Sequence, residues 1–407
     1  MMKKLFSLIF ILAILFFGCE NPVKNVPKER KNQEEKTEIK AELNHYFDSL
    51  QTNSPIPGIV AGIWIPNKNI KWVESFGYSN LEEGTPMTSE LIFRIASNTK
   101  TMTNTILLQL CDEGKISLSD TLSEYLPNFP KSDSVTIQML TDMTSGIPDY
   151  TQSNQINKWL SRDRNIYFPL DTLISFAKNM DYYFSPGEGW EYSNTNTILI
   201  QKIIQEITGN SLKHEMKNRL FRPLSLNKTQ YIASGTELPL PHSQGYFNGD
   251  TTSPPINTTE YLNTSLTPGS GAAISNILEL KKYVKHLVNG YYLSEEMQDH
   301  RLNHLVEPEG IPLPIKYGTG WMEWKGFYGH DGGLPGFTSL MLSNPSNGTT
   351  VIFWFNCKLA KYNVLDSFAR VYEIIYRTND LQSAPKSIKT NYTPGVKIEL
   401  RNPKLSP

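Results

Sequence analysis

The sequence predicts an α/β (α+β) fold in which strands from the two ends of the chain form one sheet and a mainly helical lobe is inserted between them. Apolar runs separated by turn residues occur at 58–78 and again at 315–356, which is typical of strands. Between them, from about residue 98 to residue 290, apolar residues recur mostly at helical spacing. Because two separate groups of strands need each other to complete one sheet, we expect the helical lobe to be an insertion.

The chain begins with the layout of a secretory signal, which we assign to residues 1–18. Two lysines precede an unbroken apolar run. As a helix this run would be roughly 20 Å long at about 1.5 Å per residue, shorter than the roughly 30 Å core of a membrane, so a permanent span is disfavoured. Gly18–Cys19 resembles the cleavage site of bacterial lipoproteins, with an ordinary signal peptide as the alternative. We therefore expect an extracytoplasmic lipoprotein, anchored to the membrane by a lipid on Cys19.

The next elements can be placed in order. Residues 19–37 are polar and charged without periodicity, which predicts a flexible tether. An amphipathic helix follows, because apolar residues recur at helical spacing at Ile39, Leu43, Tyr46, Phe47 and Leu50. Residues 58–78 then predict a hairpin of two strands around the turn residues NKN.

Later in the chain, Asn276 with Glu279 three residues on is typical of a capping box and predicts the start of a helix. The second group of strands is followed by an amphipathic pattern at 363–377, which predicts a last helix. Residues 379–407 are rich in Pro, Lys and Thr and predict an appended tail.

Composition narrows the function classes. The chain has 407 residues, of which 39% are hydrophobic, so it can bury a large core. Its 39 basic and 40 acidic residues give a net charge of −1, which disfavours nucleic acid or an anionic membrane surface as a partner of the whole molecule. Apart from Cys19, only Cys111 and Cys357 remain, too few for a disulfide framework.

The first candidate site is Ser97-Asn98-Thr99-Lys100, where a short apolar strand runs into an apolar helix. Positions i and i+3 share a helix face, so the serine hydroxyl can give its proton to a lysine amine that burial keeps neutral. The helix N-terminus also favours an oxyanion formed when Ser97 attacks a carbonyl. The spacing alone has low specificity, because it recurs at Ser175 with Lys178, Ser225 with Lys228 and Ser383 with Lys386.

The second candidate is Tyr192-Ser193-Asn194, which lies between a Pro-Gly turn and an apolar helix. A tyrosine can relay a proton to a leaving group, and an amide two residues away can hold a substrate carbonyl and a lysine. This pattern also recurs elsewhere, at Tyr78-Ser79-Asn80, Tyr246-Phe247-Asn248 and Tyr261-Leu262-Asn263.

The third candidate is His330-Asp331-Gly332-Gly333 at the end of a predicted strand. Glycines permit the backbone to approach a ligand closely. A backbone N–H from this segment, together with that of Ser97, would form a two-donor oxyanion hole.

Ser-x-x-Lys, Tyr-Ser-Asn and His-x-Gly, in this order and in these contexts, resemble the β-lactamase-related serine hydrolases, which include class C β-lactamases, serine DD-carboxypeptidases, and several esterases and peptidases. The resemblance covers a catalytic domain at 38–378. Two further stretches support it, TIQMLTDMTSGIPDY before the second motif and SLTPGSGAAISNILEL before the third.

The resemblance implies an antiparallel sheet flanked by helices, with an α/β lobe at 38–97 and 265–378 and a helical lobe at 98–264. It implies Ser97 as the nucleophile and Lys100 and Tyr192 as the proton-transfer pair. It further implies three substrate-binding groups without any metal or organic cofactor: the Asn194 amide, the His330 side chain, and the Gly332–Gly333 segment with its Gly333 N–H as an oxyanion donor.

The third motif departs from the Lys-Thr-Gly that is usual in the β-lactamases of this family. A largely neutral histidine beside an aspartate attracts a substrate carboxylate less well than a lysine does. His330 is similar to some DD-carboxypeptidases and esterases of the family. We therefore expect an exported serine hydrolase of the D-alanyl-D-alanine carboxypeptidase type; an esterase or β-lactamase on small molecules, and a non-catalytic binding module, are the alternatives.

Each motif also has a purely structural interpretation. Ser97 could be a helix N-cap with Lys100 solvated in the first turn. Tyr192 could be a core tyrosine that is hydrogen-bonded at its tip, and His330 a structural histidine whose tautomer Asp331 fixes.

Two other chemistries are disfavoured by the motifs. His300 and His304 have the i, i+4 spacing of metal ligands, but no Glu follows the first histidine as in zinc proteases, so we interpret them as a solvated helix face. No Gly-x-Ser-x-Gly elbow of an α/β-hydrolase is present.

Overall fold

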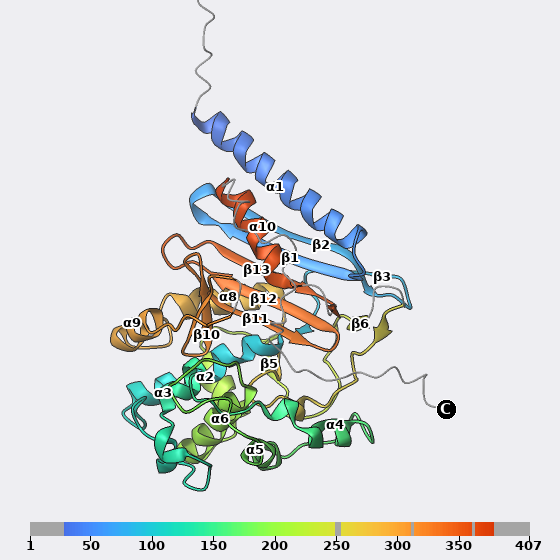
Figure 1. Cartoon of the computed structure of the whole chain (residues 1–407). Helices are drawn as coiled ribbons and strands as arrows, with labels where there is room; N and C mark the ends of the chain where they lie inside the picture. Colours follow the sequence, from blue (N-terminus) through green and yellow to red (C-terminus); the bar gives the residue numbers. More distant parts are fainter. Residues whose placement is uncertain (1–27, 249–253, 311–312, 360–362, 378–407) are drawn as a thin grey trace, which may run out of the picture.

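The computed structural model describes residues 28–248, 254–310, 313–359 and 363–377. Strands from both ends of the chain form one eight-stranded sheet, and a mainly helical lobe is attached to it (Figure 1). The strand order is β3-β2-β1-β13-β12-β11-β10-β9, and every pair in it is antiparallel. The predicted fold class is confirmed.

One strand pair of this sheet joins the two ends of the sequence. β1 (Gly58–Ile65) pairs with β2 (Ile70–Asn80) as the expected hairpin and with β13 (Thr350–Phe355) on its other side. The remaining strands are β3 (Thr85–Pro86), β9 (Lys316–Gly318), β10 (Trp321–Trp324), β11 (Phe327–Leu334) and β12 (Phe337–Ser343).

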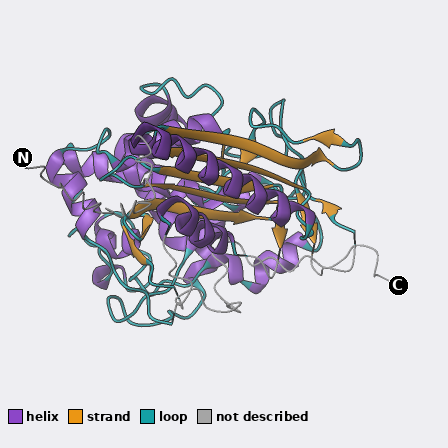
Figure 2. Cartoon of the chain, turned by 90° about the horizontal axis from the view of Figure 1, so that it is seen from above, coloured by secondary structure: helices purple, strands orange, loops and turns teal. Residues whose placement is uncertain are grey.

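Side chains on a strand alternate between the two faces of a sheet, and in β1 the side chains on both faces are buried. Ile59 and Ile63 of β1 belong to one core with α1 (Lys28–Thr52) and α10 (Val364–Tyr376). Figure 2, seen from above, shows helices lying across the strands on this face. Val60 and Trp64 belong to the second core, which α8 (Ile277–Val288) and the helical lobe complete.

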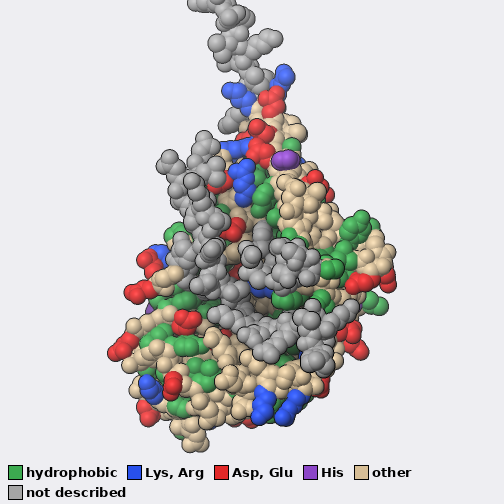
Figure 3. Space-filling view, turned by 45° about the vertical axis from the view of Figure 1, so that its right-hand side comes forward, with side chains coloured by type: hydrophobic (Ala, Val, Ile, Leu, Met, Phe, Trp, Pro, Cys, Tyr) green, Lys and Arg blue, Asp and Glu red, His purple; other side chains and the backbone are tan. Residues whose placement is uncertain are grey.

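The helix α1 begins at Lys28, so the expected tether 19–37 is helical over 28–37. These residues lack apolar periodicity, and polar contacts accompany the helix instead. Lys68 Nζ donates to Glu35 Oε1 at 2.7 Å and to the Ile375 carbonyl at 2.9 Å. Figure 3 shows acidic and basic side chains gathered along this projecting end.

In the helical lobe, α2 (Thr99–Asp112) packs against α6 (Asn194–Thr208). The shorter helices are α3 (Ile137–Asp142), α4 (Asn154–Leu160), α5 (Leu170–Lys178), α7 (Leu212–Glu215) and α9 (Glu295–Asn303). Two small sheets flank the main one, built from β4 (Phe93–Arg94), β8 (Ala273–Ser275) and β5 (Gln230–Tyr231), and from β14 (Cys357–Leu359), β6 (Tyr246–Asn248) and β7 (Ile256–Asn257).

Local signals in the sequence have their expected structures. Asn276 caps α8, with its Oδ1 accepting from the Glu279 N–H at 2.9 Å. α10 occupies the stretch where the last helix was expected. Cys111 and Cys357 are free thiols, and burial raises the pKa of each to about 12.

The lipidation candidate Cys19, the signal region and the tail 379–407 lie outside the described residues. Within the part of the chain that the structure describes, no helix combines the length and apolarity needed to cross a membrane.

Candidate active site

Ser97 lies on a 3-10 turn, Ala96–Asn98, between β4 and α2. Only 4% of its surface is exposed. Ala96 before it has φ of 49°, in the left-handed region that costs energy for any residue with a Cβ. The N-cap of α2 is Asn98, so the serine hydroxyl is not used as a helix cap, in contrast to the structural alternative.

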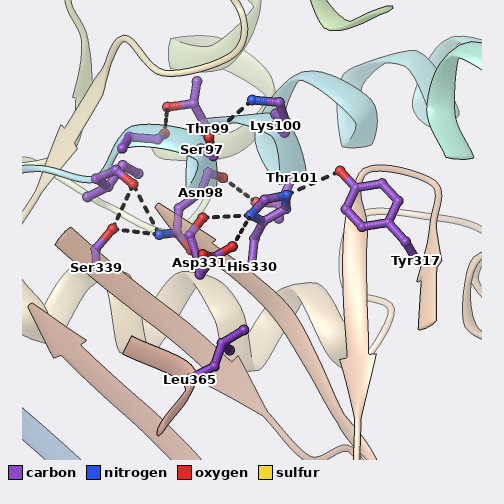
Figure 4. Close-up of polar contacts among 12 residues, drawn as sticks. Ser97, Asn98, Thr99, Lys100, Thr101, Tyr317, His330, Asp331, Ser339 and Leu365 are labelled. Carbon is purple, nitrogen blue, oxygen red and sulfur yellow. Dashed lines mark hydrogen bonds and ion pairs between the residues drawn. The ribbon is translucent and has the colours of Figure 1, made fainter. Parts of the chain in front are cut away.

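The sheet holds this turn in place (Figure 4). Asn98 Nδ2 donates to the Ile95 carbonyl at 3.0 Å and to Ser339 Oγ of β12 at 2.9 Å. Ser339 Oγ in turn donates to the Ile95 carbonyl at 2.8 Å. The strained turn is therefore fixed by side chains from two elements, which preorganises the serine.

The Lys100 amine is fully buried and lies among three polar atoms. Its Nζ is 3.2 Å from Ser97 Oγ, 2.7 Å from Asn194 Oδ1 and 3.1 Å from the Ser270 carbonyl oxygen. Burial lowers the pKa of Lys100 to about 7, although two carboxylates act in the opposite direction. A substantial fraction of this amine is therefore neutral near pH 7 and able to accept the serine proton.

Two residues of the second motif, Tyr192 and Asn194, contact the Lys100 amine. Asn194 is the first residue of α6 and is buried, and its amide oxygen makes the shortest contact of Lys100. The ring centroid of Tyr192 lies 4.8 Å from Lys100 Nζ. The structure thus brings Ser97, Lys100, Tyr192 and Asn194 together, although the two motifs are about a quarter of the chain apart.

The third motif lies beside them, with its histidine enclosed. His330 is 1% exposed, and its Nδ1 is 2.6 Å from the Asp331 backbone carbonyl and 3.4 Å from Asp331 Oδ1. A carbonyl only accepts, so Nδ1 carries a proton, and Nε2 is 3.1 Å from the Tyr317 hydroxyl. The His330 ring is 6.2 Å from that of Tyr192. Its role toward substrate stays a prediction, because both nitrogens contact the protein itself.

Gly332 explains how the third motif comes close to Ser97. A Cβ at this position would lie 2.4 Å from the Ile95 carbonyl oxygen and 3.0 Å from Ala96 Cβ. Only glycine therefore lets β11 approach the serine turn this closely. The neighbouring Gly333 pairs with Thr338 of β12, and its role as an oxyanion donor stays a prediction.

Three contributors to the site were missed by the motif analysis. Asp149 accepts from Asn194, the Ser270 carbonyl accepts from Lys100, and the Tyr317 hydroxyl contacts His330 Nε2. The first two lie in the stretches TIQMLTDMTSGIPDY and SLTPGSGAAISNILEL, which were noted only as support for the family resemblance. No local signal marks Tyr317.

His300 and His304 remain partly exposed, as expected of a solvated helix face, and they also contact α3. His304 Nε2 is 3.0 Å from Asp142 Oδ2, and His300 Nε2 is 2.8 Å from Gln138 Oε1. Among the described residues, no group of three or more His, Cys, Asp and Glu side chains is arranged to hold a metal ion.

The comparisons with known proteins agree with this geometry. Penicillin-binding protein 4* of Bacillus subtilis is 27% identical over 334 residues, which are 77% of this chain and 71% of that protein. Protein flp of Staphylococcus aureus is 28% identical over 320 residues, and the match spans 60% of that protein.

Solved structures give the same result for the fold. A D-stereospecific amidohydrolase from Streptomyces sp. has a TM-score of 0.69 and 26% identity, covering 80% of this chain and 94% of the other. The D-amino acid amidase of Ochrobactrum anthropi, solved with D-phenylalanine, has a TM-score of 0.74 at 22% identity, covering 84% and 99%.

The β-lactamase family profile matches residues 43–370, which include the serine turn, both later motifs and all strands of the main sheet. The chain therefore belongs to the β-lactamase family of serine hydrolases.

Proposed function

We propose that this protein hydrolyses an amide bond at a D-amino acid residue through an acyl-enzyme on Ser97, with D-alanyl-D-alanine peptides of the cell wall as the leading substrate class. The observation that carries the proposal is the buried Lys100 amine, 3.2 Å from Ser97 Oγ and at 0% exposure. A serine needs such a base, because its hydroxyl is a weak nucleophile by itself.

The contacts support the following reaction steps. Ser97 Oγ attacks the substrate carbonyl while its proton passes to Lys100 Nζ. Backbone N–H groups of Ser97 and Gly333 would stabilise the oxyanion, each contributing about 3 kcal/mol in comparable enzymes. The proton then reaches the leaving amine through Tyr192, whose ring lies beside Lys100. Water cleaves the resulting ester by the reverse path and regenerates the serine.

The names of the relatives support the choice of substrate. One is called a penicillin-binding protein, and two similar structures are described as D-stereospecific or D-amino acid hydrolases. From the two amidase names we transfer to this chain only an amide bond and a preference for the D configuration.

Intact-mass spectrometry with penicillin tests the nucleophile. The full-length protein should gain the mass of one penicillin, and Ser97→Ala and Lys100→Ala should not. Ser175→Ala is a matched control, because Ser175 has the same spacing to a lysine but donates to the Thr172 carbonyl of its own helix. An adduct that persists in Ser97→Ala, or full turnover in Lys100→Ala, would refute the mechanism.

A second candidate, an amidase or esterase on substrates without a terminal carboxylate, is favoured by His330. This histidine is enclosed and both of its ring nitrogens contact groups of the protein itself, so neither nitrogen is free to bind a substrate carboxylate. Rates on a D-Ala-D-Ala peptide, a D-amino acid amide, an aryl ester and a cephalosporin separate the candidates. A protein that is folded and never acylates would instead indicate a binding module.

We also propose export and a lipid anchor on Cys19, as the N-terminal pattern predicts. The membrane is then a partner through that lipid alone. Replacing Cys19 by Ser should release the protein from the membrane fraction, and unchanged membrane association would contradict a lipid at this residue.

A further inference from the structure

The carboxylate of Asp149 lies directly behind the amide that contacts the catalytic lysine. Asp149 is 4% exposed and precedes the 3-10 turn Tyr150–Gln152. Its Oδ2 accepts from Asn194 Nδ2 at 2.8 Å, and the Oδ1 atom of the same amide accepts from Lys100 Nζ at 2.7 Å. The three side chains therefore form a continuous buried series that ends at the base.

This series determines which way the Asn194 amide faces. An asparagine amide has a donor end and an acceptor end, which differ little in shape, so its orientation depends on its partners. An ionised carboxylate can only accept, so Asp149 can only pair with the NH₂ end. The oxygen end must then face Lys100, where it can accept from the amine in both protonation states.

Asp149 is itself held firmly enough to act in this way. The Thr151 N–H donates to its Oδ1 at 3.0 Å, and its own N–H donates to the Tyr183 hydroxyl at 3.0 Å. The next residue, Tyr150, donates its N–H to Thr195 Oγ1 of α6 at 2.9 Å. The loop that carries Asp149 is thus bonded to the helix that carries Asn194.

We propose that Asp149 is a positioning residue for the acyl transfer proposed above, which orients the Asn194 amide so that its carbonyl oxygen, and not its amino group, faces Lys100. This inference rests on the proposed function and adds to it a residue that does not touch the substrate. It also predicts that the charge of Asp149 affects the protonation of the base.

The charged groups around Lys100 determine the sign of that effect. The amine faces the Ser97 hydroxyl, the Asn194 oxygen, the Ser270 carbonyl and the Tyr192 ring, which are formally neutral. Burial lowers its pKa to about 7, and the negative charges of Asp149 and then Asp331 raise it. Removing the charge of Asp149 should therefore lower the pKa of Lys100, and the serine should stay reactive at lower pH.

Asp149→Asn is the direct test, read as the pH dependence of Ser97 acylation by a fluorophosphonate probe between about pH 5 and pH 9. The acid limb is the part of the pH–rate curve where the acylation rate falls as pH decreases. In Asp149→Asn the midpoint of this limb should lie about one pH unit below that of the parent, which is the lower end of the effect of a nearby opposite charge. The carboxylate of Asp149 accepts at both oxygens, from Asn194 and from the Thr151 N–H, whereas an amide at this position can accept at one end only. The acylation rate on the plateau above the acid limb should therefore also fall, by up to about a hundredfold for a misplaced group.

Asp142→Asn is the matched control. Asp142 is equally buried, at 3% exposed, in the same stretch of chain, and it pairs with His304 and the Thr144 hydroxyl instead of the site. This variant should show a lower melting temperature and the acid limb of the parent. Asp149→Glu keeps a carboxylate and should return the limb toward that of the parent.

The outcomes separate the two proposals. A parent protein whose Ser97 never reacts would overturn the proposed function, and this inference with it. A reactive parent with the same acid limb in Asp149→Asn would overturn the inference alone, and so would equal shifts in Asp149→Asn and Asp142→Asn. A shift confined to Asp149→Asn and reversed in Asp149→Glu would support it.

Discussion

Replacing Gly332 by alanine should separate the third motif from Ser97, the proposed nucleophile. The new Cβ would lie 2.4 Å from the Ile95 carbonyl oxygen, 2.7 Å from Ser339 Oγ and 3.0 Å from Ala96 Cβ. Ordinary contact between such atoms begins near about 3.4 Å, so β11 and the serine turn must move apart by about 1 Å. Two of the three atoms belong to the turn itself, and the third holds it to β12.

The consequences differ for rate and for stability. A shift of about 1 Å in a catalytic group costs about a hundredfold in rate. Overpacking of this kind destabilises the fold by about 1–3 kcal/mol. We therefore expect Gly332→Ala to remain folded at low temperature and to acylate about a hundredfold more slowly than the parent.

Stopped-flow acylation by a chromogenic β-lactam or ester and thermal unfolding measure the two effects. Gly84→Ala provides the control, because Gly84 has φ of 65° and no atom within 4 Å of an added Cβ. It should lose about 1 kcal/mol of unfolding free energy through backbone strain and none of its acylation rate. Equal acylation rates in Gly332→Ala and Gly84→Ala would refute the positional argument.

Three further predictions follow from the described contacts. Burial lowers the pKa of Lys100 to about 7, so acylation should fall as the amine is protonated below that pH, and a rate independent of pH from about 5 to 9 would exclude this lysine as the base. The hydrogen bond to Asp142 raises the pKa of His304, so this pair should stabilise the fold below the unfolded histidine pKa and lose that effect as pH rises through the folded value. Melting temperatures of the parent and His304→Gln should accordingly converge at alkaline pH, and a constant difference across the range would contradict this linkage. Asn98→Ala removes the donor to the Ile95 carbonyl and to Ser339, which should cost about 1–3 kcal/mol and slow acylation; a calorimetric scan with an unchanged midpoint would argue against these bonds.

Local order was readable from the sequence because it depends on neighbours in the chain. Ser97 and Lys100 share a helix face through a spacing of three, and Asn276 caps α8 through the N–H of Glu279 three residues on. The hairpin of β1 and β2 likewise joins adjacent segments. Each of these features involves residues close in sequence, where period and turn chemistry determine the outcome.

Other features depend on contacts that no local pattern records. The helix over 28–37 lacks an apolar stripe and is accompanied by the Glu35–Lys68 ion pair across 33 positions. His330 carries a motif that suggests a substrate-side group, yet Tyr317 and the Asp331 carbonyl occupy its nitrogens. The partners of its ring nitrogens are set by packing in the folded structure, and the periodicity of the sequence does not predict them.

The sequence by itself, with the family resemblance that its motifs carry, therefore predicted the fold class, most of the order of the elements, and the four residues that the structure brings together around Lys100. Only the tertiary structure decided how that base is tuned, since the Asp149 carboxylate lies 45 positions from Asn194 and the Ser270 carbonyl lies 170 positions from Lys100. The physical reason is that burial and electrostatic pairing arise when distant segments pack together, whereas spacing in the chain describes only the neighbours that each residue already has.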